Sequence, residues 1–527
     1  MPQPFFLDLV HRLRNSCGVV PVYWFTSPSV VVDIRARFPG VITHDYYAVI
    51  KGRPAPEFAD RDCGPLDWDL VEALREHEPI IIEMMNRNDA VYNRFTYNER
   101  LDVYFGFLRY WSMVLDECEV EAVIFEEEPH QASDFILYLL AKHRRVRTLF
   151  QIRTISKLGM IPSSDIFETS PLLLREYDRL VNPASRGERA LPLSLQSYFD
   201  LITSDYKSIL KEHLFDQVEA VENLGGRRLG SLTQALGEVR RTLTLRLVNA
   251  RVQTLMLLGL RPFESDQKVP GRSFEESRLN YLRFLLFRIK LHFIKKNNLK
   301  RYRALSAKGL DLSGKFIFVG LQFQPEKSTC PLARRFVHQL LILETLLKHL
   351  PDDWTIVVKE HPSQFVESYS RYGDQYRAAP FYDRLAAMPR MQIAPIDAVP
   401  FDLIDRAQAV ASAGGTLCWE AICRGKPALT FAHCWFQSCH GVHHIRREED
   451  VLAAIKSIQA GEQVDVELVR LFALAVHNLD VHGAVGGPHN LEFIGVTPAE
   501  NAENIARGLA KLVESLNAGD VTNDVVT

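Results

Sequence analysis

Short runs of apolar and β-branched residues alternate with patterns of helical period in the first third of the chain. The runs that predict strands are 19–25, 39–44, 122–128 and 146–152. Apolar positions three and four residues apart predict helices over 69–77, 97–117 and 132–145. Strands and helices that alternate in this way are typical of parallel βαβ units.

The pattern changes between residues 185 and 310, after a polar segment, NPASRGERALP, at 182–192 that predicts a linker. Long stretches of helical period dominate here, of which 232–259 is the longest. We therefore predict a helical insertion over 185–310.

The alternation of strands and helices returns at residue 314. The predicted strands are 315–322, 354–362, 391–396, 407–415 and 426–431, and the predicted helices are 333–351, 416–425 and 501–517. Two α/β halves separated by a helical section fit two Rossmann-type domains that face a cleft. Ligands of such sheets bind beyond the carboxyl ends of the strands.

Composition narrows the class of protein. A chain of 527 residues is too long for one ordinary core, and 47% hydrophobic with 24% charged residues is typical of globular proteins. The formal net charge of 62 − 65 = −3 argues against a nucleic-acid partner. The eight cysteines have no paired secretory spacing, and neither a signal-peptide pattern nor an apolar run of about 18 residues is present. We expect a cytoplasmic protein with reduced thiols.

The strongest local signal is ASAGGTLCWEA at 411–421, where an apolar strand runs into a helix start. Gly414 and Gly415 allow close approach of a ligand to the backbone, and free N–H groups at a helix start favour an anion. Ser412 and Thr416 add hydroxyl groups, and Glu420, one turn into the helix, could reach a ribose. A phosphate-binding turn is predicted; the alternative is a tight turn that holds no ligand.

A second polar motif, KEHP at 359–362, follows the predicted strand WTIVV. Lys359 and His361 stand where this fold keeps its ligand, and Pro362 fixes the turn that follows. His361 could donate to a phosphate or accept a proton. The alternative is a polar loop with a turn proline.

A third polar loop, LQFQPEKSTC at 321–330, follows the first strand of the C-terminal half. We place Gln324 and Glu326 among the residues that contact a bound ligand. A solvated loop is the alternative.

The run FEEEPHQ at 125–131 offers proton-handling groups at the end of an N-terminal strand. Continued strand geometry would point Glu126 and Glu128 to one face and Glu127 to the other. We predict Glu126, Glu128 and His130 as catalytic; a charged solvated loop is the alternative. His44 holds a similar strand-end position.

The cluster HCWFQSCHGVHH at 433–444 contains metal-ligand residue types, but its spacing does not match a closed zinc set. We expect no metal and no cofactor, and instead a loop in which Trp435 and Gly441 shape a ligand pocket.

The stretch 278–303 holds nine Lys or Arg residues and no acid, interleaved with apolar residues at helical spacing. Such a helix could lie on an anionic membrane surface. The alternative, an interdomain helix with a basic outer face, is favoured because so much apolar surface usually packs inside.

Several of these motifs resemble bacterial capsule and surface-polysaccharide biosynthesis proteins, a family that includes the retaining β-Kdo transferases, which use a CMP-linked sugar. The residues that carry the resemblance are QPE and ST within 324–329, VVKEHPSQ at 357–364, GGTLCWEAICRGKPALTF at 414–431 and IFEEEPHQASDFILYLLAKHRRVRTL at 124–149.

The resemblance implies roles for some of these residues. His361 and Pro362 match the His-Pro motif that contacts the nucleotide. Glu420 matches the acidic residue of the helix that follows the phosphate-binding turn. The residues that match the turn itself are Ser412, Gly414, Gly415 and Thr416.

Together the pattern and the resemblance predict a GT-B-like α/β glycosyltransferase at the inner face of the cytoplasmic membrane. Its donor would be a nucleotide-sugar, a CMP-sugar being favoured, and its acceptor a polysaccharide or glycolipid. A nucleotide-sugar epimerase and a non-enzymatic capsule assembly or export factor are the alternatives. The predicted parts are an acceptor domain at 1–184, the helical insertion at 185–310, a nucleotide-sugar domain at 311–500, and a helix and tail at 501–527.

Overall fold

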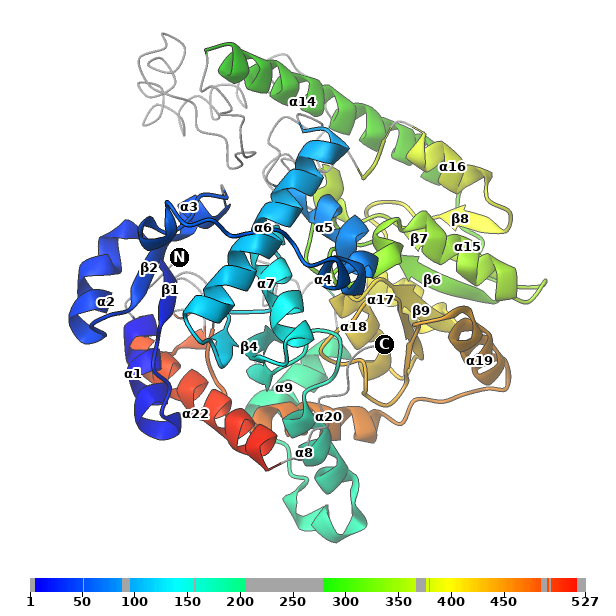
Figure 1. The fold of residues 1–527 in the computed structure, drawn as a ribbon. Coiled ribbons are helices and arrows are strands. Elements are labelled where there is room, and N and C mark those ends of the chain that lie inside the picture. The colour runs from blue at the N-terminus through cyan, green and yellow to red at the C-terminus, as the bar shows by residue number, and fades with distance from the viewer. Residues whose placement is uncertain are drawn as a thin grey trace.

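The chain folds into two α/β halves (Figure 1). The first and last helices of the chain lie side by side. A computed structural model describes residues 5–50, 52–87, 95–155, 158–204, 206, 278–365, 376–378, 380–484, 491 and 494–518. The predicted helical stretch 232–259 lies outside the described residues.

The C-terminal half is built on a six-stranded parallel sheet with the order β11-β10-β9-β6-β7-β8. Counted along the chain this is the order 3-2-1-4-5-6 of a doubly wound Rossmann sheet, in which β6 and β9 flank the point where the order reverses. The strands are β6 (Phe316–Gly320), β7 (Thr355–Lys359), β8 (Met391–Ile393), β9 (Ala409–Ser412), β10 (Ala428–Thr430) and β11 (Val442–His444).

Continuous apolar sequence explains why these strands lie at the centre. β6 and β7 read FIFVG and TIVVK, and their middle residues are fully buried, as in parallel strands covered by helices on both faces. Gly320 ends β6 without a side chain, and a Cβ there would lie 2.2 Å from Leu417 Cδ2. The glycine therefore lets the helix after β9 pack directly on the sheet.

The helices of this half follow the strands in turn. They are α14 (Arg278–Ser306), α15 (Leu340–His349), α16 (Phe381–Ala387), α17 (Pro400–Arg406), α18 (Thr416–Cys423), α19 (Glu448–Gln459) and α20 (Val466–Asn478). The predicted helix over 278–303 is confirmed by α14. None of the helices in the described ranges is long and apolar enough to cross a bilayer.

The N-terminal half contains two small sheets. β1 (Tyr23–Thr26) pairs with β2 (Ile42–Asp45) in parallel, and β3 (Ala122–Ile124) pairs with β4 (Arg147–Arg153) in parallel. β5 (Met160–Ser163) pairs antiparallel to β4, which the expectation of parallel units did not foresee. The connection from Arg153 to Met160 is too short for the crossover that a parallel partner needs.

Helices cover these sheets, and the longest of them, α6, begins with a capping box between Thr96 and Glu99. They are α1 (Phe5–Cys17), α2 (Val31–Arg37), α3 (Tyr46–Ile50), α4 (Trp68–Ala73), α5 (Glu78–Met84), α6 (Tyr97–Glu117), α7 (Ala132–His143), α8 (Pro171–Val181) and α9 (Leu193–Ile202). Parallel strands and packed helices in both halves agree with the predicted GT-B-like α/β class.

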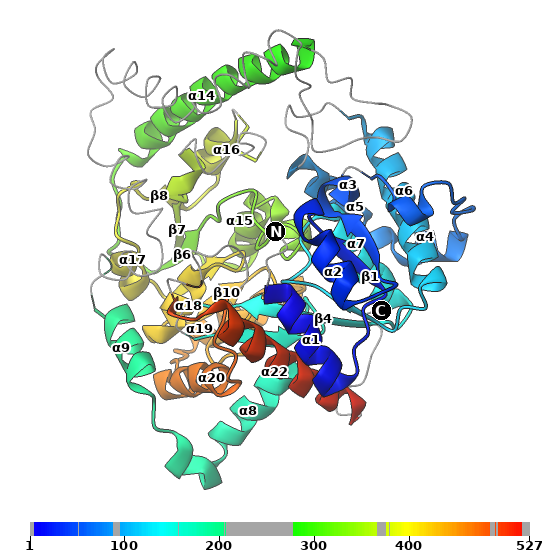
Figure 2. The same cartoon turned by 90° about the vertical axis from the view of Figure 1, so that its left-hand side faces the viewer.

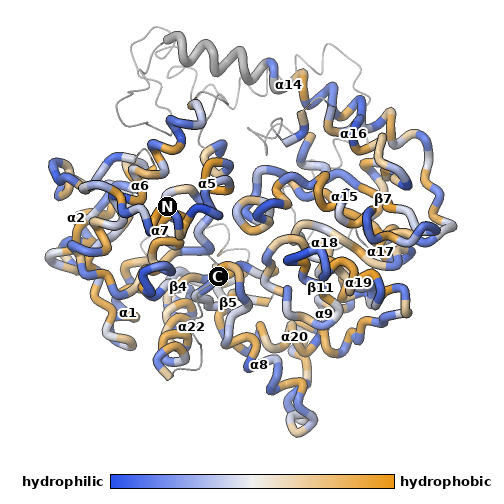
Figure 3. The backbone as a smooth tube through the Cα atoms, turned by 45° about the vertical axis from the view of Figure 1, so that its right-hand side comes forward, coloured by the Kyte–Doolittle hydropathy of each residue, from blue (hydrophilic) through white to orange (hydrophobic). Residues whose placement is uncertain are grey.

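The last helix, α22 (Pro498–Asn517), returns to the N-terminal half and packs on α1 and β5 (Figure 2). Gly508 allows this approach, since a Cβ there would lie 2.5 Å from Val481 Cγ2 and 2.9 Å from Pro162 Cγ. Hydrophobic segments run through both halves (Figure 3).

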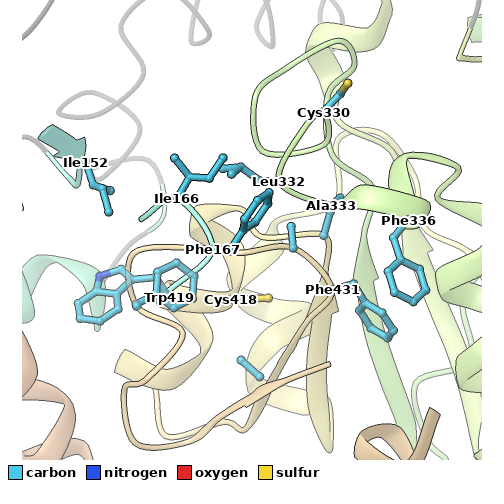
Figure 4. Close-up of a cluster of buried hydrophobic side chains, with 14 of the residues drawn as sticks. Ile152, Ile166, Phe167, Cys330, Leu332, Ala333, Phe336, Cys418, Trp419 and Phe431 are labelled. Atoms are coloured by element: carbon cyan, nitrogen blue, oxygen red, sulfur yellow. The ribbon is translucent and has the colours of Figure 1, made fainter. Parts of the chain in front are cut away.

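One apolar core joins the two halves. Ile166 and Phe167 of the N-terminal half lie beside Leu332 and Trp419 of the C-terminal half in this core (Figure 4). The contact fixes how the two halves face each other near the ends of β4 and β9.

The predicted helix over 333–351 is interrupted. A 3₁₀ turn at Arg334–Val337 precedes α15, and Arg334 adopts a left-handed φ of 45°. Its guanidinium lies 4.3 Å from the centre of the Phe167 ring of the other half, so a contact between the halves competes with helix continuation here. β11 was also not predicted, because its three residues lie inside the histidine-rich segment expected to be a loop.

Candidate functional site at the sheet switch point

Polar side chains that hydrogen bond to one another lie at the carboxyl ends of β6 and β9, where a doubly wound sheet has its ligand crevice. Gly320 pairs with Ser412 across the two strands. Ser412 Oγ donates to Gly320 O at 2.9 Å and accepts from Gln322 Nε2 at 3.1 Å. Doubly wound sheets hold their ligands at this position. Gln322 belongs to the quoted loop 321–330 but was not among the predicted site residues.

The phosphate-binding turn predicted at 412–416 forms the N-terminus of α18. Gly415 is the N-cap residue, and the N–H groups of Gly415, Thr416 and Leu417 have no hydrogen-bond partner within the described ranges. Thr416 is exposed. Unpaired N–H groups and the helix dipole together favour a bound anion.

Neighbouring residues lie so close to the two glycines of this turn that a side chain there would collide with them or press against them. A Cβ on Gly415 would lie 1.7 Å from Gln322 Nε2, so only glycine lets the glutamine lie against the helix start. A Cβ on Gly414 would lie 3.1 Å from Ala432 Cβ, in the segment that follows β10. Both glycines shape the crevice.

His361, two residues beyond β7, is a fixed hydrogen-bond donor. Its Nδ1 accepts from the backbone N–H of Ser363 at 3.2 Å, which leaves the proton of the neutral ring on Nε2. Burial, with Lys359 and Arg377 nearby, lowers the pKa of His361 to about 3. Its ring centre lies 6.0 Å from that of Phe323, on the loop that also carries Gln322. The neutral ring therefore presents an N–H at the same edge of the sheet as Gly415.

Lys359 ends β7 with a buried side chain whose ammonium has no hydrogen-bond partner in the described part of the chain. Burial lowers its pKa to about 8, although Glu360 and Asp397 oppose the shift. An ammonium without a direct partner at the end of a strand is suited to an anionic ligand.

Sequence reasoning missed the group that holds this edge in place, the buried ion pair of Glu360 and Arg377. Arg377 Nε lies 2.5 Å from Glu360 Oε2, and Tyr382 donates to the same oxygen at 3.0 Å. Glu360 Oε1 also accepts the backbone N–H of His361 at 2.8 Å. Arg377 Nη2 donates to Gln322 O at 3.2 Å. One arginine thus fixes the loops after β6 and β7.

Gln324, predicted as a ligand contact, is committed to the same internal network. Its Oε1 accepts from Arg377 Nη1 at 2.7 Å and from Gln339 Nε2 at 2.9 Å, and its Nε2 donates to Val337 O at 2.8 Å. Glu326 lies beside Ser328, whose Oγ donates to it at 3.3 Å. Burial raises the pKa of Glu326 to about 7.

Glu420 lies on α18, one turn after Thr416. Burial raises its pKa to about 8, against the effects of the Thr416 side chain, which hydrogen bonds to it, and of Arg424. A carboxyl group that keeps its proton near neutral pH does not repel a phosphate at the start of the helix.

The glutamates at 126–128 of the N-terminal half, among which the catalytic carboxylates were predicted, lie beside a lysine of the C-terminal half. Lys327 Nζ lies 2.6 Å from Glu128 Oε2 and 3.5 Å from Glu127 Oε2. The alternation predicted for Glu126, Glu127 and Glu128 is wrong, because β3 ends at Ile124 and the three glutamates follow in a bend. Despite burial, Lys327 and then Arg153 hold the pKa of Glu127 below its ordinary value.

His130 stands next to this ion pair with the opposite tautomer to His361. Its Nδ1 donates to Glu128 O at 3.0 Å, which leaves Nε2 as a proton acceptor. Burial lowers its pKa, although Glu127 opposes the shift. Arg87 donates to the carbonyl oxygens of His130, Glu326 and Cys330, so one side chain joins the loops of both halves.

Hydrogen bonds connect the ion pair of Lys327 and Glu128 with the residues at the switch point. Ser328, next to Lys327, has its Oγ 3.3 Å from both Gln322 Oε1 and Glu326 Oε2, and these two acceptors share its one hydroxyl proton. Gln322 in turn donates to Ser412. A pocket between the halves is lined by Glu128 and Trp435, among other residues. Gly441 has a φ of 83° and lies against Val464. That Trp435 and Gly441 shape a ligand pocket stays a prediction.

Within the described ranges, no three His, Cys, Asp or Glu side chains are grouped so as to hold a metal ion. The cysteines and histidines of 433–444 instead pack among themselves and their neighbours. His433 and His444, for example, have ring centres 4.7 Å apart, and burial lowers both pKa values, to about 3 and about 4.

A known protein family matches part of the C-terminal half. Residues 295–454 match the family described as capsule polysaccharide biosynthesis protein, a range that contains the switch point, His361 and α18. The match confirms the predicted resemblance to capsule and surface-polysaccharide biosynthesis proteins over this part of the chain. No curated protein matches the chain.

The solved structures that are similar to this chain at low identity include the following three. The β-Kdo 2,7-transferase KpsC of Thermosulfurimonas dismutans is 11% identical over 79% of this chain and 97% of that one, with a TM-score of 0.24. The UDP-GlcNAc 2-epimerase of Neisseria meningitidis, bound to UDP-GlcNAc, is 12% identical over 97% and 96%, with a TM-score of 0.21. The calicheamicin glycosyltransferase CalG4 is 10% identical over 96% and 94%, with a TM-score of 0.19. Similarity this low carries no conclusion about activity or substrate.

Proposed function

We propose that this protein transfers a sugar, Kdo or a related ulosonic acid, from a nucleotide-sugar to a surface polysaccharide or glycolipid acceptor. A CMP-linked donor is favoured by the motif resemblance. In this proposal residues 311–500 hold the donor and residues 1–184 the acceptor.

One observation carries the proposal: unpaired N–H groups at the start of α18 share a sheet edge with the Nε2–H of His361 and the ammonium of Lys359. These donors suit the phosphate of a nucleotide-sugar. The departing nucleotide carries negative charge, and preorganised donors stabilise that charge without reorganisation. Ser412 and Gln322 line the same crevice.

The proton of the acceptor hydroxyl would pass to a group of the N-terminal half. His130 Nε2 is a neutral proton acceptor, and Glu128 is held beside Lys327. We assign Glu126, Glu128 and His130 to this step as candidates, His130 being the best placed by its tautomer. Closure between the halves would exclude water, which would otherwise hydrolyse the donor.

Contact with the inner membrane face is proposed through α14. Lys290, Lys296 and Lys300 are exposed on it at helical spacing, and Phe293 between them is 57% exposed. The opposite side packs on the protein through Leu299 and Tyr302. An amphipathic basic surface of this kind suits anionic lipid headgroups.

The test of the proposed reaction is incubation with CMP-, UDP- and GDP-sugars, with and without an acceptor glycan. Acceptor-dependent loss of one donor is the expected result. Conversion of a donor to an isomer without acceptor would identify an epimerase. Wild-type polymer production by the His361→Ala protein in cells would instead favour an assembly or export factor.

A further inference from the structure

A second cavity lies within the N-terminal half, away from the switch point. Its volume is about 170 Å³, and it is bounded by α6 on one side and by the segment after α3 on the other. Most of its wall is apolar, with Val49, Phe58, Val103, Phe107 and Trp111 among the lining residues. An apolar cavity of ~150 Å³ accommodates one benzene ring.

Two polar side chains of the wall, His44 and Tyr110, are joined through Tyr23 by hydrogen bonds of fixed direction. His44 Nε2 lies 2.9 Å from Arg53 O and must donate to it, so His44 Nδ1 accepts from Tyr23 OH at 2.5 Å. Tyr23 OH then accepts from Tyr110 OH at 2.7 Å, and Tyr110 OH accepts from Ala55 N at 2.9 Å. Each of the three side chains in this series of hydrogen bonds is paired within the protein.

These hydrogen bonds satisfy His44, Tyr23 and Tyr110 within the protein. The three side chains are uncharged and need no polar atom from a ligand. Burial lowers the pKa of His44 to about 4 and raises the pKa of Tyr23 far above its ordinary value. Because the His44 and Tyr110 bonds fix the backbone at Arg53 and Ala55, they also hold the rim of the cavity in place.

The rim carries positive charge. Arg53 and Arg61 both line the cavity. Arg61 pairs with Glu117 at 3.4 Å, whereas Arg53 is exposed and its guanidinium has no ion-pair partner in the described ranges. An apolar cavity beside a free guanidinium suits a ligand with an apolar body and an anionic end.

The middle of α6 is also shaped around this space. Gly106 lines the cavity inside a helix of 21 residues. Glycine in a helix interior costs about 1 kcal/mol relative to alanine. Its presence there keeps a side chain out of the wall.

We infer that this cavity binds a small amphipathic anion, with an apolar ring or short chain inside and a phosphate or carboxylate at Arg53. The inference is independent of the proposed sugar transfer. The anion could be a compact aryl compound or the end of a lipid chain, and both share this chemistry.

The test is calorimetric titration of the full chain with phenyl phosphate, octyl phosphate, phenol and inorganic phosphate. Phenyl or octyl phosphate is expected to bind at least tenfold more tightly than inorganic phosphate or phenol. Tighter binding of phenyl phosphate would identify the compact anion, and tighter binding of octyl phosphate the lipid chain. Failure of both organic phosphates to bind would overturn the inference.

Two variants locate the binding. Val103→Phe fills the cavity and should abolish binding of the organic phosphate, while Arg53→Gln, at an exposed position, should weaken it about tenfold and leave phenol binding unchanged. Gly314→Ala, where an added Cβ meets nothing within 4 Å, should leave all four titrations unchanged. Organic phosphate binding that survives both Val103→Phe and Arg53→Gln, or that is lost in Gly314→Ala, would contradict the assignment.

Discussion

Lys327 of the C-terminal half and Glu128 of the N-terminal half form an ion pair, with Nζ 2.6 Å from Oε2. Lys327 is next to Ser328, whose hydrogen bond to Gln322 leads to the switch point. The carboxylates predicted as catalytic and the predicted donor crevice are thus connected through one loop. Glu128 and Lys327 are 199 residues apart in the sequence.

This ion pair predicts the effect of removing the Glu128 charge. Glu128→Gln should lower the turnover number for sugar transfer by roughly 10²-fold, the usual minimum for a proton-handling group, and leave nucleotide affinity unchanged. Steady-state transfer assays and nucleotide titrations measure the two quantities.

A matched control is Asp116→Asn, which breaks a pair of similar length, Arg144 Nη1 to Asp116 Oδ1 at 2.6 Å, on the N-terminal half alone. Its turnover should equal that of the wild type. Unchanged turnover in Glu128→Gln would remove this carboxylate from the mechanism.

Gly415→Ala tests the contact between the helix start and Gln322. The added Cβ would lie 1.7 Å from Gln322 Nε2, so the glutamine must move and the phosphate crevice must change shape. Nucleotide affinity should fall at least tenfold, and the double variant Gly415→Ala with Gln322→Ala should recover part of it. Calorimetric titration gives the affinities.

Gly314→Ala is the control for this glycine, because a Cβ at Gly314 meets nothing within 4 Å. It should bind nucleotide as the wild type does. If Gly415→Ala binds equally well, the crevice is not the nucleotide site.

The buried pair of Glu360 and Arg377 predicts a large loss of stability. Arg377→Met leaves the Glu360 charge buried without its partner, which typically costs about 3–5 kcal/mol. Urea denaturation should show this loss. The exposed pair of Arg301 and Asp383 provides the comparison, since Arg301→Met should cost less than about 1 kcal/mol. Equal costs for the two variants would contradict the role assigned to Arg377.

Glu420 predicts a pH dependence of stability. Its folded-state pKa of about 8 lies above its ordinary value of 4.5, so the folded state holds the proton more tightly than the unfolded state. Its contribution is complete below pH 4.5 and is lost as the pH rises toward 8. Glu420→Gln should therefore gain stability relative to the wild type between pH 5 and pH 8. Denaturation at both pH values tests this, and a constant difference would refute it.

The sequence predicted the parts of the site that depend on local pattern. His361, Ser412 and Gly415 lie at strand ends, because an apolar run followed by polar or glycine residues marks the end of a buried strand. The predicted boundaries of α6 match the structure because apolar positions three and four residues apart, such as Val103, Phe107 and Trp111, run along the helix.

The rest depends on pairings between distant residues. Nothing near Arg377 indicates that it pairs with Glu360 or binds Gln322 O, because both contacts arise only when β6 and β7 lie side by side. The direction of the three glutamates depends on where β3 ends, and its pairing with β4 stops at Ile124. The strand order of the sheet is likewise set by crossovers that leave no local pattern.

The most direct test of the nucleotide site is calorimetric titration of CMP, UDP and GDP into the wild-type, His361→Gln and His361→Ala proteins. One nucleotide should bind the wild type. Because a hydrogen bond to a charged group contributes about 1.5–3 kcal/mol, its affinity should fall roughly tenfold or more in His361→Ala, and less in His361→Gln, which keeps an N–H donor. Absence of binding by all three nucleotides, or equal affinity in the wild type and His361→Ala, would contradict the account.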